Sequence, residues 1–280
     1  MSSQHPKRFH VFIGVHETGL TRRNDPNAAA ADEEFDNELK TAVRRRDKSR
    51  CQACGLAVKF DPEHAYGLEI HHIDHNHANN QMDNLVLLCP MCHQILTLSE
   101  IARSSRIESK IMKLIYLPQI SQEDLNLLSW GLAVTLYRCS KADKNDETVL
   151  HVLKNTESII TEILNCNVFP DNYFNNNEET PKIIESINND MSLLGEILLQ
   201  IKKKDIKQYN CREQWLRGAR IFFNPEDHFA DMFGGIVPQL SESDMWSPGP
   251  TWTESWKSIA ETINANLLQD GDLTCGKRGL

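Results

Sequence analysis

Four cysteines in two Cys-x2-Cys pairs constrain this chain more than any other feature of its sequence. The pairs are Cys51 with Cys54 and Cys89 with Cys92. Two such pairs suit a tetrahedral zinc ion, because each pair supplies two thiolates from one tight turn. Gly55 follows the first pair and permits the backbone conformation that a tight turn requires. The sequence therefore predicts a zinc site on these four side chains.

The composition is that of a globular protein. The 280 residues, of which 40% are hydrophobic and 25% charged, are enough for two compact units with a buried core. No apolar run approaches the length of a bilayer span, and the first residues lack the apolar centre of a signal peptide. We therefore expect a cytoplasmic protein without membrane insertion. The other four cysteines show no ligand spacing and are expected to be ordinary thiols: Cys139, Cys166, Cys211 and Cys275.

The formal net charge of −9 bears on the choice of partner. Proteins that hold duplex DNA unaided usually offer a surplus of lysine and arginine to its phosphates, and this chain does not. One basic run precedes the cysteines, with Arg44, Arg45 and Arg46 followed by Lys48 and Arg50. This run either contacts phosphate or forms the solvated face of a helix, and we favour the solvated face.

The spacing of apolar residues predicts a ββα unit around the zinc site. Its strands are expected at residues 68–73 and 84–88, with a polar loop at 74–83 and a helix from residue 91 to about residue 104. Ahead of this unit we expect a short strand at 8–15, a loop at 17–32 and a helix at 34–47.

The second half of the chain has the pattern of a mainly helical region. Ser121 begins a capping box, with its hydroxyl placed to accept from the N–H of Asp124, so a helix should run from there to about residue 138. The apolar residues of that helix surround its axis, which predicts burial on more than one side. Further helices are expected at 149–164, 180–201 and 254–268, with looped or extended chain at 165–180 and 222–253.

These elements predict an α+β fold in which a zinc-stapled ββα unit is followed by a mainly α-helical region. We place the first domain at residues 1–112 and the second at residues 113–280. The second domain ends in a segment with several prolines that contains Trp246, Trp252 and Trp256. These tryptophans either form a docking surface for a partner or pack the last helix onto the body, and we favour packing.

Residues 46–93 resemble the HNH endonuclease superfamily. The match includes both cysteine pairs, the tract Leu-Glu-Ile-His-His-Ile-Asp that begins at Leu68, and the tract from Asp83 to His93. The resemblance implies that the four cysteines clamp the ends of an HNH-like ββα unit around a structural zinc. A closed four-thiolate site of this kind does no chemistry itself.

The same resemblance implies a catalytic set beside the zinc. His72 corresponds to the general base that activates water, and Asn84 to a residue that restrains the loop. His71 and His93 correspond to ligands of a catalytic divalent ion, Mg²⁺ or Mn²⁺. Hydrolysis of a phosphodiester needs both an activated nucleophile and a cation that stabilises charge on the phosphate.

His71 and His72 are neighbours, and neighbouring residues of a strand point to opposite faces. Both can serve one ion and one water only if the strand bends or ends there. Otherwise one of the pair packs or caps the loop and the other faces solvent. His64, His75 and His77 are interpreted as loop histidines to which no role is assigned.

Residues 113–126 carry a second resemblance, to the IcmJ/DotN family of type IVB (Dot/Icm) secretion systems. The pattern is Tyr-Leu-Pro-x-x-Ser-Gln-x-x-Leu-Asn, from Tyr116 to Asn126. In that family an HNH-like zinc fold is a subunit of the coupling complex that recruits effectors to the secretion channel. The resemblance implies an adaptor that binds the coupling ATPase and other coupling subunits, and that reaches the inner face of the membrane through them.

Three functions are therefore open from the sequence. The first is a zinc-binding adaptor of a secretion coupling complex, which the acidic balance favours. The second is a divalent-metal-dependent HNH DNA endonuclease, and the third is a DNA-binding module without catalysis. DNA is a partner only under the second and third.

Overall fold

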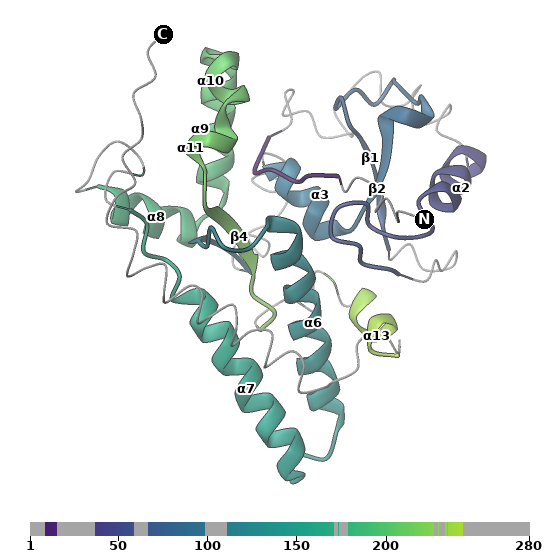
Figure 1. Cartoon of the computed structure of the whole chain (residues 1–280), viewed down its shortest axis with the longest axis vertical. Helices are drawn as coiled ribbons and strands as arrows, with labels where there is room; N and C mark the ends of the chain where they lie inside the picture. Colours follow the sequence, from purple (N-terminus) through teal and green to yellow (C-terminus); the bar gives the residue numbers. More distant parts are fainter. Residues whose placement is uncertain are drawn as a thin grey trace, which may run out of the picture.

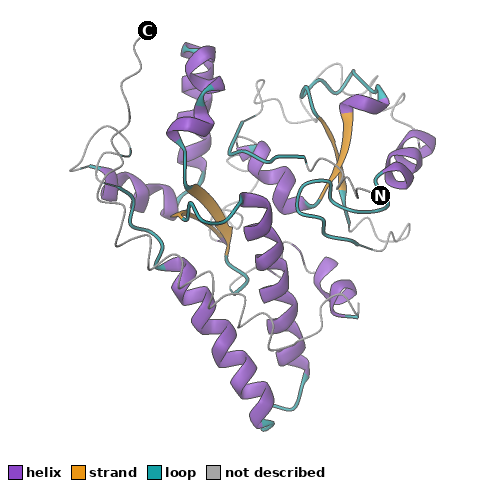
Figure 2. Ribbon diagram, in the orientation of Figure 1, coloured by secondary structure: helices purple, strands orange, loops and turns teal. Residues whose placement is uncertain are grey.

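The computed structural model describes residues 9–15, 37–58, 67–98, 111–170, 173, 179–226, 229, 233 and 235–242. A small ββα unit with a helix beside it lies on one side, and a second sheet with the other helices, two of them long, forms the rest of the described structure (Figure 1). Within these residues there are two separate two-stranded sheets (Figure 2). The predicted α+β class, with an HNH-like ββα unit followed by a mainly helical region, is confirmed.

The ββα unit consists of two short antiparallel strands and one short helix. β1 (Glu69–His72) pairs with β2 (Leu85–Leu88), and helix α3 (Pro90–Leu96) follows directly. All of β2 is buried, which matches its unbroken apolar sequence. Pro90 occupies the first helical turn, where a missing N–H removes no intrahelical hydrogen bond.

Helix α3 is shorter than the predicted helix of residues 91–104. It ends at Leu96, and the N–H of Thr97 closes the last turn onto the carbonyl of Gln94. Thr97 itself leaves helical geometry, with φ of −127° and ψ of 39°. The part of the predicted helix beyond residue 98 lies outside the described residues.

Helix α2 (Asn37–Arg46) packs against β2 and is held there by its last residue. The Arg46 guanidinium donates to the carbonyl of Leu85 at 2.6 Å and to the Asp47 carboxylate at 2.7 Å. That carboxylate in turn accepts from the N–H of Leu87 at 3.0 Å. Arg46 therefore ties the helix to the sheet, which corrects the interpretation of the whole basic run as a solvated face. The predicted loop at 17–32 lies outside the described residues.

Residues 9–15 form no strand, contrary to the strand predicted at 8–15. Their N–H groups donate to several different elements instead of to one neighbouring strand, so no ladder is built. The acceptors are the Gln52 carbonyl for Phe9, the Glu123 carboxylate for Val11, the Ile95 carbonyl for Gly14 and the Tyr209 hydroxyl for Val15. The segment thus connects the ββα unit to the helices of the second half.

A second sheet joins segments that lie far apart in the sequence. β3 (Met112–Tyr116) pairs with β4 (Ala219–Phe223) in an antiparallel register that places Leu114 opposite Ile221. Neither strand is among the predicted elements, and β4 overlaps the region expected to be looped. A pairing between distant segments leaves no hairpin turn in the sequence from which it could be recognised.

Helices α6 (Gln122–Lys141) and α7 (Glu147–Leu164) form an antiparallel hairpin that extends away from this sheet (Figure 1). The Ser121 hydroxyl accepts from the N–H of Asp124 at 3.1 Å, so the predicted capping interaction is confirmed. Most of the first half of α6 is buried, including Trp130 in its interior. The predicted burial of this helix on more than one side is confirmed.

The remaining helices of the described residues are short. They are α8 (Thr180–Asn189), α9 (Ser192–Lys204), α10 (Ile206–Asn210), α11 (Arg212–Trp215) and α13 (Ile236–Ser241). Of these, α10, α11 and α13 are not among the predicted elements. The single helix predicted at 180–201 is wrong, because Asp190 is extended with φ of −148°. Its carboxylate accepts from the N–H of Ser192 at 3.0 Å, and such a local bond competes with helix continuation.

Two further predictions concern the end of the chain. The expectation that residues 222–253 are entirely looped or extended is corrected by α13, which lies within them. The helix predicted at 254–268 lies outside the described residues, and so do Trp246, Trp252 and Trp256.

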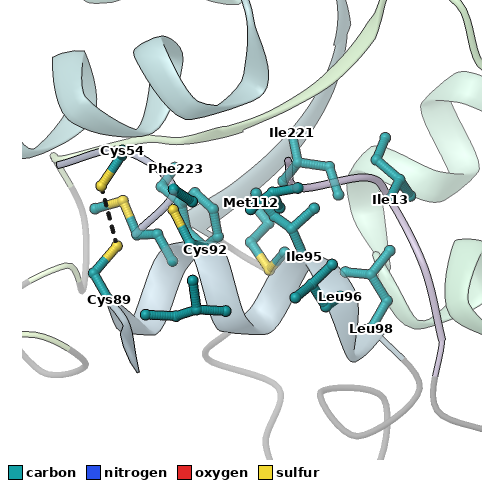
Figure 3. Packing of buried hydrophobic residues seen from close by; sticks show 14 of the residues in the cluster. Ile13, Cys54, Cys89, Cys92, Ile95, Leu96, Leu98, Met112, Ile221 and Phe223 are labelled. Atoms are coloured by element: carbon teal, nitrogen blue, oxygen red, sulfur yellow. Dashed lines mark hydrogen bonds between the residues drawn. The ribbon is translucent and has the colours of Figure 1, made fainter. Parts of the chain in front are cut away.

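A large buried apolar cluster runs from the cysteine pairs into the second sheet (Figure 3). Ile95 of α3 belongs to the same cluster as Met112 of β3 and Phe223 of β4. Its members come from both sides of the boundary predicted between residues 112 and 113, and that boundary stays a prediction. None of the described helices combines the length and apolar character needed to cross a bilayer.

Candidate metal centre

The first cysteine pair lies in a tight turn just before the ββα unit. The N–H of Gly55 donates to the carbonyl of Cys51 at 2.9 Å, and the N–H of Cys51 donates to the carbonyl of Leu56 at 2.8 Å. Gly55 has φ of +80°, a conformation that side chains with a Cβ disfavour. The turn predicted after Cys54 is therefore present, and it directs both thiols of the pair inward.

The second pair lies where β2 gives way to helix α3. Cys89 is the N-cap residue of α3, and Cys92 lies in its first turn. Strand and helix therefore place these two thiols opposite the first pair. All four cysteines are buried, at 2% exposure or less.

The four sulfur atoms converge on one point. They all lie within 4.8 Å of one another, and the Sγ atoms of Cys54 and Cys89 are 3.7 Å apart (Figure 3). Four thiolates around a tetrahedral zinc ion, with Zn–S bonds of about 2.3 Å, would be separated by about 3.8 Å. The predicted set of four ligands is therefore assembled at a spacing that fits a metal ion.

The chemistry of the thiols also fits a cation. Burial and the neighbouring sulfur atoms raise the pKa of the Cys89 and Cys92 thiols well above the ordinary value. Burial opposes ionisation of Cys51 as well, but hydrogen bonds from the three other thiols outweigh it and lower its pKa. Without a cation, the surroundings thus favour the thiolate of Cys51 and the protonated thiols of Cys89 and Cys92. A bound cation stabilises thiolates at such a site.

His71 and His93 lie together beside this cluster. Their ring centroids are 5.0 Å apart, and the ring of His75 approaches His71 at the same distance. The Nδ1 atom of His93 also contacts the carboxylate of Glu69. Glu69 and His71 are two residues apart on β1 and therefore share the face that packs against α3.

His72 has different neighbours. Its Nε2 atom lies 2.9 Å from Oδ1 of Asn80, and its ring centroid is 5.2 Å from that of His77. His72 is 8% exposed, and β1 ends at this residue. The two neighbouring histidines therefore separate as strand geometry requires, with His71 beside α3 and His72 beside the loop that follows.

Asn84 lies at the end of a short 3-10 helix, η1 (Met82–Asn84), directly before β2. Its Oδ1 accepts from the N–H of Asp74 at 3.1 Å, and its Nδ2 donates to the Asp74 carboxylate at 2.9 Å. Nδ2 also donates to the carbonyl of Asn79 at 2.8 Å. Asn84, at the end of the polar loop, thus bonds the first residue of the loop and one in its middle.

The structure thus brings the predicted residues together in three groups. The four thiols form one group, His71 and His93 a second, and His72 and Asn84, which each bond residues of the loop, a third. Across the described part of the chain, the thiols are the one set of three or more His, Cys, Asp or Glu side chains whose ligand atoms converge closely enough to hold an ion.

Sequence reasoning missed several neighbours of the histidines. Glu69 could have been found, because its spacing from His71 places both on one strand face. The sequence predicts no role for His75 and His77, yet the ring of each lies close to a histidine of the predicted set. Asn80 lies in an irregular loop, where no periodicity indicates which side chain turns inward. His64 lies outside the described residues.

Comparison with known proteins gives two kinds of match. The H-N-H endonuclease F-TflIV of Escherichia phage T5 is 48% identical over 46 residues, which are 16% of this chain and 19% of that protein. The type 4 apparatus protein DotN of Legionella pneumophila is 24% identical over 136 residues, which are 49% of this chain and 59% of DotN. In both cases the chain spans less than two thirds of the relative's own length.

The family model of the HNH endonucleases matches residues 51–97. This stretch begins at the first cysteine of the cluster and ends one residue after helix α3. It is the stretch that brings the thiols and the histidines together around an antiparallel strand pair. The chain therefore contains a domain of the HNH endonuclease family, at residues 51–97.

Proposed function

We propose that this protein is a zinc-binding HNH-fold adaptor of a type IVB secretion coupling complex. In this role it binds the coupling ATPase and other coupling subunits and supports effector recruitment from the cytoplasmic face of the membrane. The observation that supports this most is the extent of similarity. The match to the type 4 apparatus protein covers 49% of the chain, whereas the match to the phage endonuclease covers 16%.

Zinc is the ion that we propose for the four thiols. Cys51, Cys54, Cys89 and Cys92 would hold it, and it would supply folding energy. A centre with four protein ligands has no open position for water or substrate. The centre is therefore a structural component of the adaptor.

Two observations favour the adaptor over cutting of DNA. The Nε2 atom of His72 bonds Asn80 and its ring contacts His77, whereas the ring of His71 contacts His93. The net charge of −9 leaves no surplus of Lys and Arg with which to bind a phosphate backbone. A nuclease would need a general base to activate water and a surplus of Lys and Arg to hold the phosphate backbone.

The adaptor role is tested by a binding titration between the full chain and the coupling ATPase of the same organism's secretion system. The wild type and His72→Ala should bind with equal affinity, because the interaction needs the fold and not the general base. Cys89→Ser should lose binding, because the metal centre would no longer form. Absence of wild-type binding, or equal binding to an unrelated ATPase, would refute the adaptor.

A metal-dependent DNA endonuclease is the second candidate. It is favoured by the adjacent rings of His71 and His93, with the Glu69 carboxylate in contact with His93. Plasmid nicking with added Mg²⁺ or Mn²⁺ tests it. Nicking that His72→Ala abolishes would support the endonuclease, and His151→Ala on the exposed face of α7 is the matched control. Absence of nicking across both metals would exclude it.

A further inference from the structure

A buried amide reaches the metal centre from the helical region. The Nδ2 atom of Asn126, on α6, donates to the Sγ atom of Cys92 at a distance of 3.2 Å. Both residues are 0% exposed, so water does not compete for this bond. An N–H donor to a thiolate stabilises its negative charge and restricts its orientation. Such partners of metal ligands typically strengthen metal binding.

The orientation of the Asn126 amide decides whether it helps or opposes the thiolate. Its nitrogen end donates, whereas its oxygen end would repel a negatively charged sulfur. Gln122 lies one helical turn earlier, and its Nε2 donates to Oδ1 of Asn126 at 2.9 Å. Because the oxygen end is bound to Gln122, the nitrogen end faces Cys92.

Gln122 is itself oriented by the backbone of β4. The N–H of Ile221 donates to Gln122 Oε1, and the Ile221 carbonyl accepts from Gln122 Nε2, both at 2.8 Å. The side chain of Gln122 thus bonds β4 as a neighbouring strand would. Both hydrogens of its Nε2 have acceptors, so rotation of the amide would break three hydrogen bonds at once.

We propose that Asn126 is a positioning residue for the zinc centre, and that Gln122 and the backbone of Ile221 keep its donor directed at Cys92. The proposal rests on the zinc ion proposed above. It gives the pattern from Tyr116 to Asn126 a structural role, because Ser121 begins the helix that carries both amides. The metal centre of the HNH domain is thereby bonded through side chains to the second sheet.

A competitive zinc titration of the full chain against a chelator tests this role. Asn126→Ala should weaken zinc binding by about 10–100-fold, the usual effect of removing an outer partner of a metal ligand. Gln122→Leu should act in the same direction, because the Asn126 amide loses the bond that orients it. Unchanged zinc affinity in Asn126→Ala would overturn the proposal.

Ser129→Ala is the matched control. Ser129 is as deeply buried on the same helix, and its hydroxyl donates to the carbonyl of Leu125 at 3.1 Å. This variant loses a buried hydrogen bond to the backbone of its own helix, not to a cysteine, and should keep the zinc affinity of the wild type. An equal loss of affinity in Ser129→Ala would show that Asn126 acts through general stability, which would also overturn the proposal.

A second measurement needs no substitution. In wild-type protein loaded with cadmium-113, the side-chain amide of Asn126 should show a scalar coupling to the metal through the N–H···S bond. A folded, cadmium-loaded protein without this coupling would overturn the proposal. If the wild type binds neither zinc nor cadmium, the metal centre itself fails; if it binds them without the coupling, only the role of Asn126 fails.

Discussion

Asn84 bonds the loop between β1 and β2 with a single side chain. Its amide makes three hydrogen bonds, to the Asp74 N–H, the Asp74 carboxylate and the Asn79 carbonyl. Asn84→Ala should therefore lower the free energy of unfolding by about 1–2 kcal/mol, as expected for partly exposed hydrogen bonds. Urea denaturation measures this change. Asn76→Ala, which loses one bond to the N–H of Ala78, should have a smaller effect, and equal effects would contradict this account.

Asp74 should make the same loop sensitive to acid. Burial alone would raise the pKa of its carboxyl, but hydrogen bonds from Asn79, Asn84 and the N–H of Asn76 together lower it. Because the folded-state pKa is below the ordinary value, the stabilisation is complete above about pH 4 and is lost as pH falls through the folded-state pKa. The protection factor of the Asn76 amide, which compares its exchange rate with the intrinsic rate at the same pH, should therefore fall only in acid.

The control for the acid response is Asp83→Asn, which removes an exposed carboxylate at the end of the same loop. It should leave the exchange profile at Asn76 unchanged. Asp74→Asn should raise exchange at Asn76 already at neutral pH. A profile that is independent of Asp74 would contradict the assignment.

For single residues, the sequence predicts which face of an element a side chain lies on better than which side chain it contacts. The alternation of a strand predicts opposite faces for His71 and His72, and their rings have different neighbours, His93 and His77 respectively. The cysteine spacing predicts a set of four ligands, and the four thiols lie close enough together to hold a metal ion. The bond between Asn80 and His72 could not be predicted, because the position of a loop side chain depends on a turn that has no sequence period.

Among the elements, β3 has an edge that a side chain protects. The amide of Asn188, on α8, accepts from the N–H of Leu114 at 2.6 Å and donates to the carbonyl of Leu114 at 3.1 Å. Leu114 is 0% exposed, so water cannot replace Asn188 as the hydrogen-bond partner of these backbone groups. Asn188→Ala should therefore cost about 1–3 kcal/mol of stability, because buried backbone groups lose their partners.

Thermal unfolding followed by circular dichroism measures this cost. The control is Asn189→Ala, on the next residue of α8, which is exposed. It should change the melting temperature little. A loss of stability in Asn189→Ala as large as in Asn188→Ala would show that the effect comes from the helix and not from the edge of β3.

The helices and strands differ in how well the local sequence predicts them. α6 and α7 are predicted well, because caps and apolar spacing lie within the helix itself. The break between α8 and α9 is missed, because one Asp side chain outweighs an apolar spacing that continues through it. β3 and β4 are missed because each strand is defined by a partner from another part of the chain.

For the whole molecule, the metal centre and the second sheet share one buried cluster. Cys92, Met112 and Ile221 belong to it together (Figure 3). The fold class follows from the cysteine pattern and the helix signals, but this shared core does not. Packing between distant segments depends on tertiary contacts, which cannot be recognised from the sequence of either segment alone.

The central claim is that one zinc centre stabilises both parts of the molecule and that the protein serves as a folded scaffold. Hydrogen–deuterium exchange of the full chain, before and after zinc extraction with a chelator, tests it most directly. We expect extraction to increase exchange in β3 and β4 as well as in residues 51–97, and reloading with zinc to restore protection. An increase confined to residues 51–97, or no change on extraction, would contradict the claim.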